Sequence, residues 1–439
     1  MHPALESPDI QHEIFWHLRF QEEIRFDDRE RKLRKQTLRD AALTSRAWMN
    51  EALAALWWRI EDVLCLFKLL PNFVKPDGEQ QWIRIAAGPG GSDALSPAVP
   101  YLLSKIPERA PFVARIVITV NVTQRSSEQL ASLNHLRFLY IAFYHSKRDL
   151  FRFIDRLGEI PTLEEVEIMS YERTPAMPSR INPLTLQQSF PSLQKIKYSG
   201  SFGEMRTILG RLPSHGVTSI SFECVYASRQ YDSIEDDEDQ WPYLLQLIER
   251  KFRTSCTQLS FQSPRTRHPN LNVLSMGIGQ LRFLLTALPN ITHLDLGSIP
   301  CVGLTNHDVE CIADTWPNLV ALTLSSFYED VNGDTSLACL LPLATRCPHL
   351  KTLAIAVHTA VPIPEYPLDP SSLIFNSKLE TLTIAAKDAE RPDQVAAYLR
   401  MFFPRLVRVW RWRGVYDGKK AGMGTFWEMV NRSLAGLAV

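Results

Sequence analysis

The chain of 439 residues lacks an excess of charge of either sign, because Lys and Arg together number 48 and Asp and Glu together also number 48. Proteins that bind nucleic acid or anionic membranes over a broad surface usually carry a basic excess. The chain also contains no run of about 18 uncharged apolar residues that could cross a bilayer. The composition therefore predicts neither a nucleic-acid partner nor a membrane partner.

Cysteine is scarce and scattered, with seven residues at positions 65, 224, 256, 301, 311, 339 and 347. None forms a Cys-x-x-Cys pair or a spacing with histidine suited to zinc, so we expect no metal. The N-terminus does not show the basic and then apolar segments of a secretory leader. Reduced, mostly buried thiols are typical of cytoplasmic and nuclear proteins, and we expect this chain in the cytoplasm, the nucleus or both.

Catalytic signatures are missing as well. The glycine-rich stretch AAGPGGSD at 86–93 lacks the Lys-Ser/Thr pair of a phosphate-binding loop, and the chain has no G-x-S-x-G, H-E-x-x-H or kinase signature. The acidic run at 234–240 has neither the glycine nor the spacing of a calcium loop. These absences predict a binding protein without a cofactor. An enzyme site hidden near 224–255 is the alternative.

Repetition is what the chain has in abundance. The stretch LPNITHLDL at 288–296 returns as WPNLVALTL at 316–324 and as CPHLKTLAI at 347–355. Segments that fit Leu-x-x-Leu-x-Leu, with any large apolar residue allowed at the three fixed positions, begin at 113, 136, 163, 193, 217, 256, 291, 319, 350 and 379. We call each such segment a frame, and its three apolar residues the first, central and third frame positions. The last four starts lie 28, 31 and 29 residues apart. A near-constant interval of this kind indicates stacked structural repeats.

Helix-patterned segments separate these frames, for example at 148–160, 203–212, 307–316 and 393–403, with apolar residues at three- and four-residue steps. Proline falls shortly before most frames and ends the preceding helix. The strand and helix units resemble leucine-rich repeats over 111–412. The resemblance implies an α/β solenoid, a horseshoe with a parallel sheet and outer helices. An ordinary doubly wound α/β domain is the alternative.

The first seventy residues show short amphipathic helical stretches and several tryptophans instead. SPDIQHEIFWHL at 7–18, AALTSRAW at 41–48 and LWWR at 56–59 resemble an F-box of the fungal type, with a charged insert at 19–37. The resemblance implies that a Skp-type adaptor binds Pro3, Leu5, Ile10, Ile14, Phe15, Leu18, Leu43, Trp48, Leu56 and Trp57. A helical cap for the solenoid is the alternative.

The two resemblances imply four regions: an F-box-like helical domain at 1–75, a linker at 76–110, a leucine-rich-repeat solenoid at 111–413 and a C-terminal capping helix at 414–439. They also imply a role as the substrate-recognition subunit of a Skp, cullin and F-box ubiquitin ligase. In that role the adaptor leads to a cullin scaffold, and the repeats bind an unknown target protein. A protein-interaction scaffold unrelated to ubiquitin is the alternative.

Side chains between the frame positions should point away from the core, onto the open surface of the sheet. The candidates for binding a target there are Phe138, Tyr140, Glu165, Glu167, Lys195 and Lys197. The two glutamates should meet the two lysines, because neighbouring strands lie about 4.8 Å apart. Mutual neutralisation on a solvated face is therefore favoured over a target site.

The last frame-like stretch, VRVWRWR at 407–413, interleaves arginine and tryptophan, which often dominate the energetics of interfaces. The further candidates are Arg408, Trp410 and Trp412. A slip of one residue exchanges the two faces of a strand, so the core set is either Leu406 and Val409 or Val407, Trp410 and Trp412. An edge strand covered by the final helix at 425–437 is the alternative to a binding role.

Overall fold

The computed structural model describes residues 36–37, 40, 81–86, 98–109, 112–119, 124–143, 147–170, 190–224, 241–262, 276–297, 299, 301–324, 335–357, 378–385, 391–406, 408–411 and 425–436. The chain divides into two compact units, Met1–Val122 and Thr123–Val439. Of the first eighty residues only Gln36, Thr37 and Asp40 are described, in a helical conformation. The F-box-like stretches and all ten adaptor candidates lie outside the described residues.

Between residues 81 and 119, the described residues of the first unit form a strand, a helix and a second strand. β1 (Gln81–Ala86) and β2 (Val113–Thr119) pair in parallel, and α6 (Ala98–Arg109) connects them. The structure thus places a strand and a helix in 76–110, where the sequence predicted only a linker. The sequence pattern did not predict β1, because Gln80 stands where the first apolar residue of a frame would be. Ile83 nevertheless pairs with Ile116, the central frame residue of β2.

The second unit is built on a parallel sheet, which confirms the α/β class. Its neighbouring strands are, in order, β3 (Phe138–Phe143), β4 (Glu165–Ser170), β5 (Lys195–Gly200), β6 (Ser219–Cys224), β7 (Gln258–Gln262), β9 (His293–Asp295), β11 (Ala321–Leu324), β12 (Thr352–Ala356), β13 (Thr381–Ala385) and β14 (Val409–Arg411). Two short strands, β8 (Met276–Gly277) and β10 (Cys301–Val302), pair separately.

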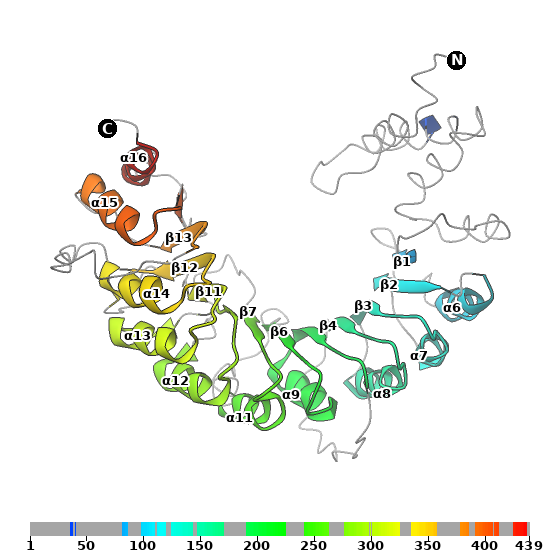
Figure 1. Cartoon of the computed structure of the whole chain (residues 1–439). Helices are drawn as coiled ribbons and strands as arrows, with labels where there is room; N and C mark the ends of the chain where they lie inside the picture. The colour runs from blue at the N-terminus through cyan, green and yellow to red at the C-terminus, as the bar shows by residue number, and fades with distance from the viewer. Residues whose placement is uncertain are drawn as a thin grey trace, which may run out of the picture. The chain divides into compact units, whose positions relative to one another are not determined.

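The helices of the second unit cover one side of this sheet. They are α7 (Gln124–Ala131), α8 (Lys147–Leu157), α9 (Phe202–Arg211), α11 (Trp241–Phe252), α12 (Ile278–Ala287), α13 (Asn306–Thr315), α14 (Leu340–Arg346), preceded by the short helix η3 (Leu337–Cys339), α15 (Pro392–Phe402) and α16 (Thr425–Leu434). Figure 1 shows the strands of this unit along the inner side of an arc and helices α7 to α15 along its outer side. We call the side of the sheet away from these helices the inner face.

The frame residues align across the strands as the repeat predicts. The central frame position forms one buried row through Leu139, Val166, Ile196, Ile220, Leu259, Leu294, Leu322, Leu353, Leu382 and Val409. A backbone ladder fixes the register, since one carbonyl before each strand accepts two N–H groups from the next repeat. For example, the Thr292 carbonyl accepts from Val320 and Ala321 at 2.7 and 3.1 Å. The strands therefore bury alternate side chains under the helices.

Aromatic side chains fill the core near the middle of this unit. Tyr198, Phe222 and Phe261 occupy the third frame position of β5, β6 and β7, where other repeats carry Ile or Leu. The Trp241 ring stands edge-on to Phe202 and Phe261 at centroid distances of 4.9 and 5.0 Å. Larger rings thus replace aliphatic residues without breaking the strand register.

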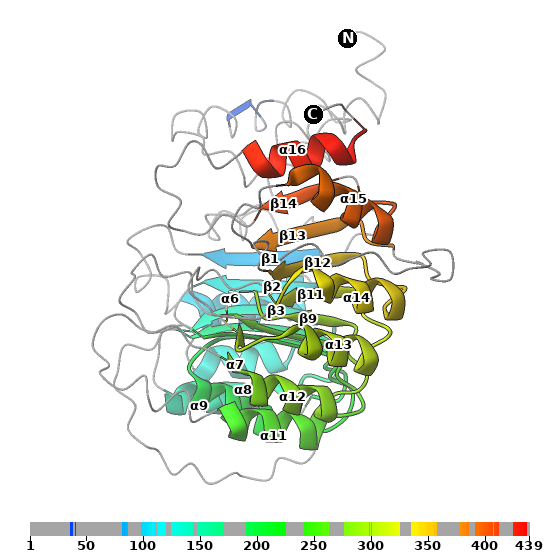
Figure 2. The ribbon, with the colours of Figure 1, turned by 90° about the vertical axis from the view of Figure 1, so that its left-hand side faces the viewer.

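The C-terminal end of the sheet is closed by α16, the final helix that the sequence predicts. Figure 2 shows α16 beside α15 and β14. The Asn431 side chain on α16 accepts from the Val409 N–H at 2.8 Å and donates to the Val409 carbonyl at 3.0 Å. This amide pairs with the backbone at the outer edge of β14 as another strand would. Among the described residues, no helix is long and apolar enough to span a bilayer.

Candidate interaction surface

The inner face presents the side chains that stand between the frame residues. Strand register puts the candidates Phe138, Glu165 and Lys195 in one row across β3, β4 and β5, and Tyr140, Glu167 and Lys197 in the next row. All six side chains are at least partly exposed. The structure therefore brings these candidates together on one surface.

The charges on β4 and β5 pair with one another. Lys197 Nζ lies 2.6 Å from Glu167 Oε1, and Lys195 Nζ lies 3.7 Å from Glu165 Oε2. The predicted meeting of these residues across neighbouring strands is confirmed. Because each carboxylate already has a lysine beside it, this part of the face carries little net charge.

The next strands carry two carboxylates with neutral partners. Glu223 on β6 accepts from Ser199 Oγ at 3.0 Å. Asp295 on β9 accepts from Gln262 Nε2 and from the Gly297 N–H, each at 3.0 Å. Neither carboxylate forms an ion pair with a Lys or Arg of the described residues. Beside Asp295, burial lowers the pKa of His293, which favours the neutral ring at neutral pH.

Small uncharged side chains cover the inner face from β11 to β13. They are Ala321, Thr323, Thr352, Ala354, Thr381 and Thr383. Short side chains therefore cover this part of the inner face, and the larger side chains of β14 stand at its end. The sheet thus has a charged half and an uncharged half on the same face.

The last strand settles which residues of 407–413 face the core. Leu406 and Val409 are buried, with exposed fractions of 5% and 1%, whereas Trp410 is 48% exposed. Trp410 pairs in register with Thr383, which places it on the inner face. The Arg408 guanidinium lies 3.9 Å from the centre of the Trp410 ring, a cation–π contact. Trp412 lies outside the described residues.

The described residues contain no group of three or more His, Cys, Asp or Glu that could hold a metal ion. Burial raises the pKa of the Cys256, Cys301 and Cys347 thiols to about 12, so these cysteines are not nucleophiles at neutral pH. On the inner face Trp410 is 48% exposed at one end, and Phe138 and Tyr140 are partly exposed on β3.

Sequence reasoning missed two residues of this surface. Glu223 and Gln262 are adjacent in register beyond the last frame position of β6 and β7. The signal was available, because continuing the alternation by one more residue past Phe222 and Phe261 places both side chains on the inner face. The frame ends at its third apolar position and therefore does not include Glu223 and Gln262.

No known protein-family model matches the chain, and no curated protein matches it. Among solved structures, that of the leucine-rich repeat-containing protein LegL7 from Legionella pneumophila is similar to 82% of this chain and 99% of that chain, at 14% sequence identity and a TM-score of 0.34. A similarity of this size says nothing of function, and the fold described above rests on strand register and burial.

Proposed function

We propose that this protein is a non-catalytic interaction subunit that binds a target protein on the inner face of its parallel sheet. The observation that carries the proposal is the sheet itself: one face is buried under helices, and the other presents mostly polar, partly exposed side chains with Trp410 at its end. Repeats that stack in this way create extended binding surfaces. Tryptophan and arginine often contribute most to interface energy, so Trp410 and Arg408 are the first residues to test.

The finer part of the proposal assigns the subunit to a ubiquitin ligase. The F-box-like stretches within 1–75 would bind a Skp-type adaptor and, through it, a cullin scaffold in the cytoplasm or nucleus. The subunit would then act by holding its target near a ubiquitin-conjugating enzyme, which raises the effective concentration of the target. The support for this part is the resemblance of the stretches within residues 1–75 to an F-box.

Co-purification of the full chain with a Skp-type adaptor tests the assignment. Changing Ile14 and Trp57 to Asp should abolish capture of the adaptor, because both lie in the apolar stripe that would enter the complex. The matched control is Trp410→Ala, which removes an exposed aromatic residue far along the sequence and should leave capture unchanged. Wild-type protein that never captures the adaptor at micromolar concentrations would remove the ligase assignment.

A scaffold unrelated to ubiquitin is the second candidate, and the backbone pairing of Asn431 at the edge of β14 bears on its form. Because the outer edge of the last strand is already occupied, self-association by strand addition at this end is disfavoured. Sedimentation of the full chain that shows a concentration-dependent dimer, with no adaptor bound, would favour the scaffold over the ligase subunit.

A further inference from the structure

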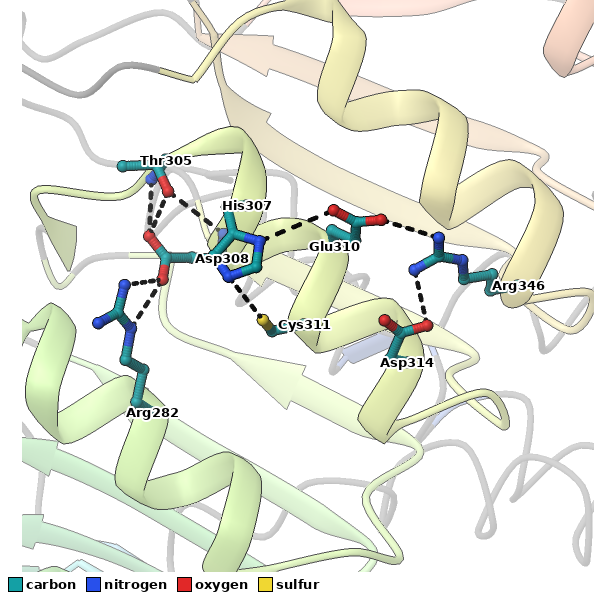
Figure 3. Close-up of polar contacts among 8 residues, drawn as sticks. All are labelled: Arg282, Thr305, His307, Asp308, Glu310, Cys311, Asp314 and Arg346. Atoms are coloured by element: carbon teal, nitrogen blue, oxygen red, sulfur yellow. Dashed lines mark hydrogen bonds and ion pairs between the residues drawn. The ribbon is translucent and has the colours of Figure 1, made fainter.

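A cysteine and a histidine lie side by side on the outer surface of α13. Cys311 Sγ is 3.7 Å from His307 Nε2, one helical turn away. Figure 3 shows the imidazole above the thiol on the same side of the helix. His307 is 72% exposed, and Cys311 is the one free cysteine of the described residues that is not buried. The contact between the two side chains therefore lies at the surface of the helix.

The distance between these atoms fits a tetrahedral metal ion. A zinc ion binds thiolate sulfur at about 2.3 Å and imidazole nitrogen at about 2.1 Å, so two such ligands of one ion stand roughly 3.6 Å apart. The observed 3.7 Å separation needs almost no rearrangement. Two donors four residues apart on a helix are also the arrangement by which helical zinc motifs chelate one ion.

The second nitrogen of His307 faces a carboxylate. His307 Nδ1 lies 3.7 Å from Glu310 Oε2, and the other oxygen of Glu310 accepts from Arg346 at 2.8 Å. Arg346 also binds Asp314 at 2.6 Å, which holds this set in place (Figure 3). Metal-binding histidines commonly donate their free N–H to a carboxylate, which fixes the ring and raises its basicity.

Two carboxylates, Glu310 and Asp314, lie on the same helix as the pair, and one arginine, Arg346, contacts both of them. Thiolate and imidazole together prefer zinc and similar soft cations to magnesium or calcium.

We propose that His307 and Cys311 form a two-residue chelate for a thiophilic divalent cation such as Zn²⁺. Glu310 orients the imidazole and is not a ligand, and water completes the coordination. With two protein donors, binding is reversible and weaker than in four-ligand structural sites. The ion replaces the thiol proton of Cys311, which leaves to solvent. The site lies on the helical side of the sheet and does not depend on the function proposed for the inner face.

Titration of the reduced, metal-free full chain with Co²⁺ tests the site, because a cobalt–thiolate bond gives a charge-transfer absorption band in the near ultraviolet. Wild type should develop the band, and Zn²⁺ should remove it by displacement. Cys311→Ser should abolish it. Glu310→Gln should weaken Co²⁺ binding about tenfold through loss of the carboxylate partner.

The matched control is His349→Ala, which removes an exposed histidine outside α13 and should leave Co²⁺ binding unchanged. His307→Ala should weaken binding by more than the Glu310 variant does, and His307→Gln repeats the test if the alanine variant shows reduced helical circular dichroism. Three outcomes would overturn the proposal: no band in wild type at millimolar Co²⁺, an undiminished band in Cys311→Ser, or equal binding by the His307 and His349 variants.

Discussion

Two ion pairs of nearly equal length occupy different surroundings in this protein. On the inner face, Lys197 and Glu167 meet at 2.6 Å, and their side chains are 44% and 21% exposed. On the helical side, Arg282 and Asp308 meet at 2.8 Å, and the Asp308 side chain is 1% exposed. The fold therefore holds the charge of Asp308 in a buried contact, whereas the charges of Glu167 and Lys197 remain available to a partner.

Asp308 does more than form an ion pair. It is the third residue of α13, and it accepts hydrogen bonds from the Thr305 N–H at 3.1 Å and the Thr305 hydroxyl at 2.6 Å, while its own N–H donates to that hydroxyl (Figure 3). This capping box begins the helix, and Arg282 ties it to α12. The Glu167 side chain, by contrast, is 21% exposed. The inner-face charges can therefore change with little effect on stability.

The largest expected effect comes from removing the buried carboxylate. Asp308→Ala should lower the free energy of unfolding by about 2 to 3 kcal/mol, because half of the capping box is lost and part-buried donors of Thr305 and Arg282 are left without their acceptor. Urea denaturation followed by circular dichroism measures the change. Asp314→Ala, on the same helix and also bound to an arginine but 58% exposed, should change stability by less than about 0.5 kcal/mol. Equal losses of unfolding free energy in the two variants would contradict the distinction between buried charges held by the fold and exposed charges available to a partner.

Acid should remove part of the Asp308 contribution. Burial raises the pKa of Asp308, but the hydrogen bonds from Thr305 and Arg282 together lower it by more than burial raises it. The pKa of Asp308 therefore lies below its ordinary value. Stability from such a group is complete above the unfolded pKa, near 4, and is lost as the pH falls through the lower folded pKa. The stability advantage of wild type over Asp308→Asn should therefore shrink between about pH 5 and pH 2. An advantage that stays constant over this range would contradict the assignment.

The smallest effect is expected on the inner face. A double-mutant cycle of Glu167→Gln and Lys197→Met should give a coupling energy of about 0.2 to 1 kcal/mol, since exposed ion pairs contribute little. The coupling should fall further in high salt, because exposed charges are screened. A coupling above about 2 kcal/mol would show that this pair stabilises the sheet, and it would weaken the case that the face is free to bind.

The repeat frame predicted the second unit well because strand alternation and helix periodicity leave direct marks in the sequence. Leu294, Leu322, Leu353 and Leu382 are each recognisable, and they align in one buried row. β1 was missed because a single polar residue, Gln80, stands in its frame. The predicted pairing of Glu167 with Lys197 needed only the order of the strands and the interval between repeats.

The sequence by itself determined the α/β class, the repeat period and the residues that alternate between core and surface, because these follow from local periodicity. Tertiary structure alone decided the rest. It turned Trp410 outward and Val409 inward, since α16 and β13 fix a register that the sequence left open by one residue. It also buried Asp308 beside Arg282, because that contact depends on which turns of α12 and α13 face each other and not on spacing along the chain.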